Sequence, residues 1–164
     1  MNVKTMTRIA AVAAIYIVFT VIISPLSYGE YQFRFAEILV LLCFYRKDYS
    51  YGLIIGCLIA NIFSPFGIVD VVFGTLATAI SVYLISRSKN LYLASLFPVI
   101  FNGIIVGLIL YYIGEVPIPL YLLMFYVAAG EFIVVSIIGV ILFKQLEKNE
   151  GFLKLIEANQ NSHF

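Results

Sequence analysis

This sequence of 164 residues has little charge, no tryptophan and a single histidine. Charged residues make up 12% of the chain and hydrophobic residues 63%. The stretch from Leu91 to Ile113 carries no charge at all. An α-helix needs a run of about 20 apolar residues to cross the hydrocarbon core of a bilayer. The scarcity of charge therefore predicts an all-α integral membrane protein, embedded in the lipid bilayer.

Several motifs are also missing. No G-x-x-x-x-G-K-[ST] phosphate loop occurs, so we expect no ATPase in this chain. His163 is alone, and no His/Cys/Asp cluster has the spacing of metal ligands, so we expect no metal and no cofactor. Cys43 and Cys57 lie inside apolar segments and are expected to be buried thiols. We also expect no nucleic-acid partner.

Charges and Pro/Gly breaks divide the chain into six apolar segments, at about 7–23, 33–45, 49–63, 68–86, 91–113 and 118–143. The prediction is a six-transmembrane-helix bundle that forms one domain over 1–164, with a cytoplasmic tail at 144–164. Six spans leave no room for a soluble catalytic domain. The first segment lacks a clean A-x-A cleavage site and is interpreted as a retained helix.

The basic residues predict an orientation. Nine of the ten lie at the same side of an up-and-down six-helix path, and Arg34 is the exception. Because cytoplasmic loops are rich in Lys and Arg, both termini are expected to be cytoplasmic. Loops 24–33, 64–70 and 113–118 would then face outward. With tryptophan absent, tyrosines are expected to form the interfacial belt: Tyr28, Tyr31, Tyr45, Tyr49, Tyr51, Tyr92, Tyr111 and Tyr112.

Carboxylates collect toward the predicted outer side. Glu131 lies about halfway along the sixth segment with no basic residue within a helical turn. A charge inside the membrane costs about 2.5–3.5 kcal/mol on insertion scales, so it normally faces a protein interior or a wet cavity. Glu131 is therefore either a protonated group bonded to a neighbouring helix or a carboxylate that faces a ligand.

Two further pairs of polar residues are candidates. Arg34 and Glu37 are three residues apart and share a helix face, so they either anchor a loop-to-helix junction or line a ligand cavity. Asn61 and Asp70 flank a helix break, and broken helices with polar residues build substrate sites in transporters. Asp70 could equally cap the following helix. Asn102 is either interhelical glue or a ligand contact.

Small residues recur at intervals of four: Ala10 and Ala14, Gly52 with Gly56 and Ala60, and Gly103 with Gly107. This spacing lets helices approach closely, and internal packing accounts for most of these residues. The first helix is the one expected to face a partner, so Ala10 and Ala14 are candidate docking residues.

These features together resemble those of a known group of transport proteins. A small six-helix protein with an outer pocket and no ATPase resembles the substrate-binding S component of an energy-coupling factor (ECF) transporter. Within that group the sequence is similar to the QueT family, which takes up queuosine precursors. The matching stretches are Pro25–Gly29, Gln32–Glu37, Gly56–Asn61 through Gly67–Asp70 to Gly74–Thr78, Pro98–Gly103 with Gly107, and Gly130–Glu131.

The resemblance implies a ligand of the deazaguanine type, 7-aminomethyl-7-deazaguanine (preQ1) or a close relative. It also implies an ECF transmembrane coupling subunit and two cytoplasmic ATPase subunits that use ATP, and a place in the bacterial cell membrane as a multi-pass protein. The carboxylates independently favour a cationic or donor-rich solute. Asp70 and Glu37 are expected to hold its ammonium group, while Asn61, Asn102 and Glu131 contact the ring edge.

Two other functions remain open at this point. One is an S component for another vitamin, such as riboflavin or thiamin. The other is a small intramembrane enzyme, which is disfavoured because no Ser or Cys has a histidine base in the membrane. A structural or assembly subunit is a weaker third option.

Overall fold

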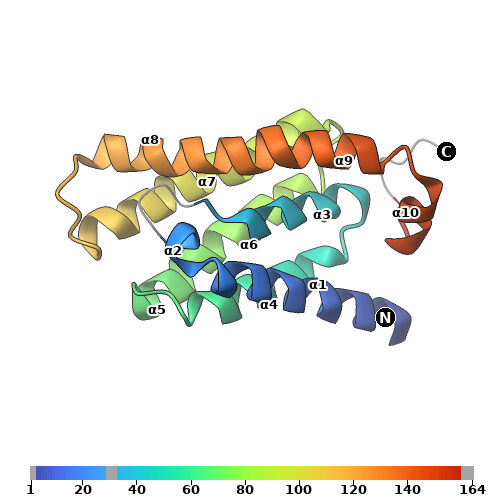
Figure 1. Ribbon diagram of the computed structural model, residues 1–164, viewed down its shortest axis with the longest axis horizontal. Helices are drawn as coiled ribbons and strands as arrows, with labels where there is room; N and C mark the ends of the chain where they lie inside the picture. The colour runs from blue at the N-terminus through green and yellow to red at the C-terminus, as the bar shows by residue number, and fades with distance from the viewer. Residues whose placement is uncertain (1–2, 29–32, 160–164) are drawn as a thin grey trace.

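The computed structural model describes residues 3–28 and 33–159, and every regular element in these ranges is helical. Figure 1 shows the helices running along the long axis of the molecule. The sequence expectations that fall on residues 29–32, among them part of the 24–33 loop and Tyr31, lie outside the described residues.

Within the described ranges, four helices are long and apolar enough to cross a membrane. The first is α1, Val3–Ile22. The second is Gly67–Ile85, in which α5 (Gly67–Val69), the π-helical η2 (Asp70–Gly74) and α6 (Thr75–Ile85) follow one another. The third is α7, Leu91–Tyr112. The fourth is Leu120–Leu146, composed of α8 (Leu120–Glu131), the π-helical η3 (Phe132–Gly139) and α9 (Val140–Leu146).

The other helices are shorter. They are α2 (Ser24–Ser27), the 3-10 helix η1 (Phe35–Leu41) with its continuation α3 (Leu42–Tyr45), α4 (Tyr49–Asn61) and α10 (Glu150–Leu155). The helical path is interrupted after α4. Gly67 starts the next helix at φ +61°, a conformation that only glycine adopts without strain. The helix break expected between Asn61 and Asp70 is therefore confirmed.

Small residues bring two pairs of helices together. A Cβ built on Gly56 of α4 would lie 3.2 Å from the Cα of Ala13 in α1. A Cβ on Gly107 of α7 would lie 2.9 Å from the Cα of Met124 in α8. Neither position has room for a side chain, so the prediction that these glycines serve internal packing is confirmed.

The tyrosines do not all form a belt. Tyr51, Tyr92, Tyr111 and Tyr112 are exposed, as a belt requires, whereas Tyr28, Tyr45 and Tyr49 are buried. Their hydroxyl groups bond inside the protein: Tyr45 to Glu147 at 2.8 Å and Tyr49 to the carbonyl of Ile156 at 3.0 Å. The expectation was wrong for these three because a tyrosine near a helix end can turn inward when an acceptor is available there.

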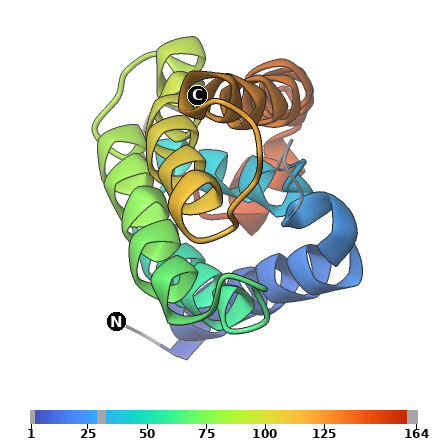
Figure 2. The ribbon, with the colours of Figure 1, turned by 90° about the vertical axis from the view of Figure 1, so that its left-hand side faces the viewer.

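Both ends of the described chain lie at the same end of the bundle. In Figure 1 the start of α1, the α3–α4 turn and α10 are all at the right-hand side, while α5 and the α7–α8 connection lie at the left. Figure 2 views the molecule from that opposite end, with the helices arranged around a common centre. We call these the terminal end and the α5 end.

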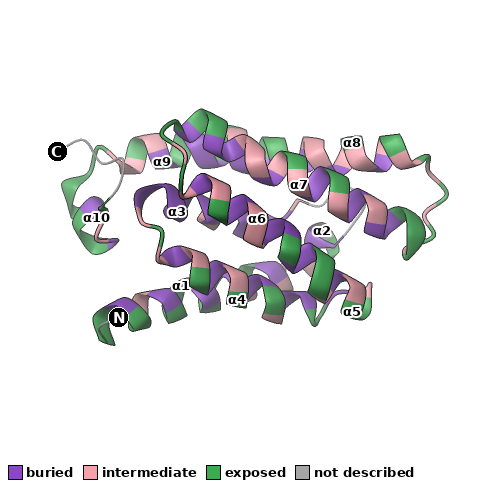
Figure 3. Ribbon diagram, turned by 180° about the vertical axis from the view of Figure 1, so that it is seen from behind, coloured by how far each residue is buried: buried purple, intermediate pink, exposed green. Residues whose placement is uncertain are grey.

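The tail folds against the bundle. Leu153 of α10 is buried, and the backbone N–H of Asn159 donates to the carbonyl of Tyr45 at 3.0 Å. Figure 3 shows the exposed outer faces of the helices and the buried surfaces between them. The segment 144–164 is thus partly helical and packed as far as it is described.

Candidate binding site

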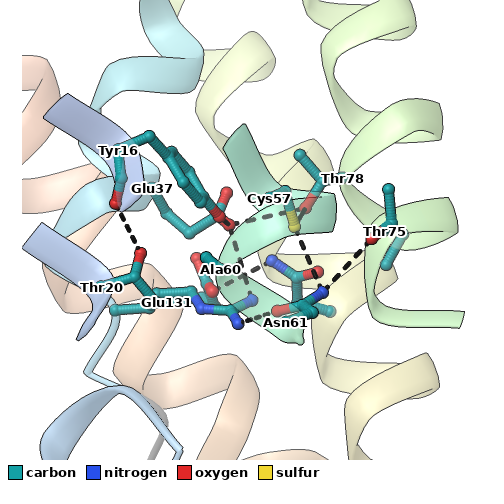
Figure 4. A network of polar contacts seen from close by, with 12 residues as sticks. Tyr16, Thr20, Glu37, Cys57, Ala60, Asn61, Thr75, Thr78 and Glu131 are labelled. Atoms are coloured by element: carbon teal, nitrogen blue, oxygen red, sulfur yellow. Dashed lines mark hydrogen bonds and ion pairs between the residues drawn. The ribbon is translucent and has the colours of Figure 1, made fainter. Parts of the chain in front are cut away.

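A cluster of polar side chains is buried between the helices. Asn61 ends α4 and Asp70 lies near the start of the Gly67–Ile85 span, whereas Asn102 and Glu131 lie near the middle of their spans. The cluster contains all six residues that the sequence singled out, and each exposes 3% or less of its surface: Arg34, Glu37, Asn61, Asp70, Asn102 and Glu131. They come from η1 and the residue before it, from α4, η2, α7 and the end of α8. Figure 4 shows most of this network from close by.

Glu37 lies at the centre of the first group of contacts. Its Oε1 accepts a hydrogen bond from the hydroxyl of Tyr16 on α1 and another from Thr78 on α6 at 3.5 Å. Nη1 of Arg34 lies 4.0 Å from the same oxygen. The expected Arg34–Glu37 pair is therefore present, but two other helical elements, α1 and α6, take part in it.

Asn61 connects Arg34 to the next helix. Its Oδ1 accepts from Nη2 of Arg34, and its Nδ2 donates to the backbone carbonyl of Asp70 at 3.1 Å. The same amide lies 3.4 Å from the hydroxyl of Thr75 and 3.4 Å from the sulfur of Cys57. Both polar atoms of Asn61 are thus engaged within the protein, and they fix the position of the guanidinium.

Asn102 and Glu131 form the second group. Nδ2 of Asn102 donates to Oε1 of Glu131 at 3.0 Å, between α7 and the end of α8. The two groups adjoin, because η1 packs against both α7 and η3. The interhelical bond expected of Asn102 exists, yet it uses only one polar atom of each residue.

Four buried atoms of this cluster have no hydrogen-bond partner among residues 3–28 and 33–159. They are Nε of Arg34, Oε2 of Glu37, Oδ1 of Asn102 and Oε2 of Glu131. More than nine in ten buried polar groups are bonded in folded proteins, and leaving one unbonded costs about 1–3 kcal/mol. A ligand that presents several donors and one acceptor would satisfy all four.

The carboxylates of the cluster lie where the backbone departs from an α-helix. Glu37 is in the 3-10 helix η1, Asp70 begins the π-helix η2, and Glu131 immediately precedes the π-helix η3. Such segments are rare within helices and are often found at functional sites. The altered turn re-aims side chains relative to a regular α-helix.

Asp70 does not cap a helix with its side chain. Neither α5 nor η2 has a side-chain cap hydrogen bond, and Asp70 follows directly from α5. Gly74 makes room for it, since a Cβ at that position would collide with the carboxylate of Asp70 and lie 2.9 Å from Nδ2 of Asn61. The carboxylate of Asp70 therefore lies beside Asn61 inside the bundle.

Sequence reasoning missed several members of the network. Tyr16 and Thr78 were not selected, Cys57 was treated only as a buried thiol, and Tyr28 was assigned to the belt. Cys57 lies 3.2 Å from the hydroxyl of Thr78, and Arg34 lies over the ring of Tyr28 at 5.4 Å. The available signal was modest: Tyr16, Cys57 and Thr78 are polar or polarisable residues within apolar segments.

A surface groove at the α5 end approaches the cluster. It has a volume of about 330 Å³ and is lined by Ser24, Pro25, Tyr28, Phe63 and Pro65. Tyr28 belongs to both features, because its ring contacts Arg34 and its hydroxyl donates to the carbonyl of Ala60 at 2.6 Å. Among the described residues, Tyr28 thus lines the groove and also contacts the guanidinium.

The candidate docking residues lie elsewhere. Ala10 and Ala14 are exposed on α1, whereas Ile9, Ala13 and Tyr16 of the same helix face the bundle. α1 thus has one face that carries Tyr16 into the cluster and another that leaves two small residues on the surface.

Comparison with known proteins adds an independent result. A sequence model of the QueT transporter family matches residues 6–148. The queuosine precursor transporter QueT of Lactococcus lactis subsp. cremoris (strain MG1363) is 41% identical over 90 residues, covering 51% of this chain and 53% of that protein. The chain thus matches about half the length of this curated relative, and no solved structure matches it.

The matched region contains all six residues of the cluster as well as Tyr16 and Thr78. Together with the four long apolar helices, it makes the protein a multi-pass protein of the bacterial cell membrane. Because the match extends over most of the chain, this protein belongs to the QueT transporter family.

Proposed function

We propose that this chain is the substrate-binding S component of an ECF-type importer and captures a queuosine precursor, preQ1 or a close relative, from outside the cell. The observation that carries the proposal is the buried cluster with four unbonded polar atoms. A membrane protein retains such a cluster where it has a function, because an unsatisfied polar group inside the bilayer is costly. The family and the relative in Lactococcus support the choice of ligand.

The proposed topology has six membrane crossings. Phe35–Tyr45 and Tyr49–Asn61 are shorter apolar helices, and we propose that they complete the crossings together with the four long ones. Both termini would be cytoplasmic, since the terminal end carries nine of the ten basic residues. The α5 end would then face outward, together with the groove beside Tyr28.

The charges of the cluster favour a cation. Three carboxylates, Glu37, Asp70 and Glu131, are buried with one guanidinium, that of Arg34. Such an excess of acid stabilises a ligand with a positive charge and many donors. A deazaguanine with an aminomethyl group supplies an ammonium, an exocyclic amine and ring N–H groups as donors, and O6 as an acceptor.

The unbonded atoms suggest how the ligand is held. We propose that Oε2 of Glu37 binds the ammonium, and that Oε2 of Glu131 and Oδ1 of Asn102 bind the donors of the ring edge. The buried carboxylate of Asp70 would join Glu37 at the ammonium. Nε of Arg34 is available for O6. Asn61 has both polar atoms engaged, so its role would be to orient Arg34.

Transport would require partners. We propose a transmembrane coupling subunit and two cytoplasmic ATPase subunits, which supply ATP hydrolysis, and we propose that this chain itself catalyses no reaction. Ala10 and Ala14, exposed on α1, would form part of the surface that meets the coupling subunit. The Ala14→Leu variant should lose uptake in cells and still bind ligand when purified. Loss of ligand binding in detergent would contradict this assignment.

The direct test is titration of the purified protein with preQ1, riboflavin and thiamin. We expect saturable binding of preQ1 alone and recovery of a deazaguanine from protein purified out of membranes. Binding of riboflavin or thiamin in preference to preQ1 would identify a different S component. Conversion of a candidate substrate by the isolated chain would instead show an enzyme.

A further inference from the structure

We propose that the groove between α4 and α6 at the terminal end binds the headgroup of an anionic phospholipid. The groove has a volume of about 540 Å³. It is lined by Lys47, Asp48, Ser50, Tyr51, Ile54, Ala79, Val82, Tyr83, Ser86 and Arg87. It shares no residue with the buried cluster and does not depend on which solute the protein carries.

The basic residues of this groove lack acidic partners. Among the described residues, five bases at this end form ion pairs with a glutamate or aspartate: Lys4, Arg8, Arg46, Lys144 and Lys154. No such pair includes Lys47 or Arg87 in the part of the chain that the structure describes. The positive-inside bias accounts for bases at this end, but not for two unpaired bases lining one groove.

The acid in the groove is already neutralised. Oδ2 of Asp48 accepts hydrogen bonds from Nε and Nη2 of Arg46, at 3.0 and 2.8 Å. The guanidinium of Arg87 lies over the ring of Tyr83 at 4.5 Å, which holds it beside the groove. Lys47 and Arg87 therefore leave a net positive charge that an anionic group can neutralise.

The walls of the groove indicate a lipid as the source of that anion. Ile54, Ala79 and Val82 make them apolar, and the helices that carry them expose large hydrophobic side chains, among them Ile55 and Leu76. Tyr51 and Tyr83 are exposed at the level of the bases, as expected of side chains at the membrane–water boundary. Basic pockets between transmembrane helices bind anionic headgroups, with the acyl chains along the apolar faces.

The test is native mass spectrometry of the full chain with phosphatidylglycerol and phosphatidylcholine of identical acyl chains. The wild type should retain about tenfold more phosphatidylglycerol than phosphatidylcholine, because Lys47 and Arg87 each attract the anionic headgroup and so raise the affinity for it. The variant Lys47→Gln/Arg87→Gln should lose this preference and keep its affinity for preQ1. Excess inorganic phosphate or glycerophosphoglycerol, which lack acyl chains, should not displace the lipid.

A matched control removes two charges elsewhere at the same end. Lys148→Gln/Lys154→Gln should keep the preference for phosphatidylglycerol. An equal loss in both double variants would show general electrostatic attraction and overturn the site. Displacement by inorganic phosphate would assign the groove to a free anion, and so would overturn the lipid. A wild type without lipid preference, combined with lost uptake in Lys47→Gln/Arg87→Gln, would assign the groove to a partner protein and also overturn the proposal.

Discussion

Two charged regions of this molecule differ in how completely their groups are paired. At the terminal end, the carboxylate of Glu157 forms ion pairs with Lys4 at 3.3 Å, with Arg46 at 2.8 Å and with Arg8. In the buried cluster, Glu37 and Glu131 each leave one oxygen without a partner in the described part of the chain. The first region is partly exposed to solvent, while the second is sealed inside the bundle.

Under the proposed function, the difference separates a structural contact from a ligand-binding site. Glu157 connects the tail to α1 and to the α3–α4 turn, and its charge is balanced by bases of the same chain. Exposed ion pairs of this kind contribute little to stability and depend on salt. The buried cluster has more carboxylates than bases and is shielded from solvent. Under the proposed function, the bound ligand would supply the missing charge and donors.

The largest effect is expected when one glutamate is substituted in each region, which tests whether only the buried cluster binds ligand. Glu131→Gln removes a charged acceptor from the cluster and should weaken preQ1 binding by about tenfold or more, since hydrogen bonds to charged groups contribute about 1.5–3 kcal/mol. Isothermal titration of the purified variant measures it. Glu157→Gln is the control and should leave the affinity unchanged. Equal affinity of Glu131→Gln and the parent would reduce Glu131 to a packing residue.

The second test varies the charge of the ligand and asks whether the buried carboxylates favour a cation. The aminomethyl deazaguanine should bind about tenfold more tightly than its neutral nitrile counterpart, which has the same ring edge but no ammonium. The excess of buried carboxylate over Arg34 is the physical reason. Side-by-side titration of both ligands decides the matter. Equal affinities would mean that the cluster binds only the ring and that its carboxylates serve the fold.

The two tyrosine–glutamate bonds offer a smaller, matched test. Tyr16 donates to Glu37 in the cluster, and Tyr45 donates to Glu147 at the terminal end at 2.8 Å. A typical hydrogen bond contributes about 0.5–1.5 kcal/mol, so Tyr16→Phe should lower preQ1 affinity by several-fold through a less well oriented Glu37. Tyr45→Phe should not change the affinity. If both variants bound like the parent, Tyr16 would be a scaffold residue only.

The smallest effect is expected from the tail and depends on pH. The hydrogen bond from Arg8 lowers the pKa of Glu157 from 4.5 to about 2. The stabilisation of the docked tail is therefore complete above about pH 4.5 and is lost as the pH falls toward 2. A spin label at position 150, on the exposed face of α10, should become more mobile across this range and stay unchanged between pH 7 and pH 5.

The variant Glu157→Gln provides the control for that measurement. Without the charge, the label should already be mobile at pH 7, and its mobility should depend little on pH. A tail that stays immobile in Glu157→Gln would show that burial of Leu153 and the bond from Asn159 to Tyr45 hold it without the ion pairs.

Much of the candidate site could be predicted from single residues. Arg34, Glu37, Asn61, Asp70, Asn102 and Glu131 are polar groups in apolar segments, and all six are buried in one region. A polar residue within an apolar segment can be recognised from the sequence alone, without knowledge of the fold. The partners were not predictable, since Tyr16 and Glu37 are 21 residues apart and Asn102 and Glu131 are 29 apart.

The sequence by itself determined the helical membrane character, the helix break before Gly67 and the family. These follow from hydropathy and from local motifs, which add up residue by residue. Only the tertiary structure decided that Tyr28 faces Arg34 instead of the bilayer surface, that Tyr16 donates to Glu37, and that four polar atoms remain unbonded. The physical reason is that a hydrogen bond depends on which helix faces meet, and that geometry arises from the packing of all helices together.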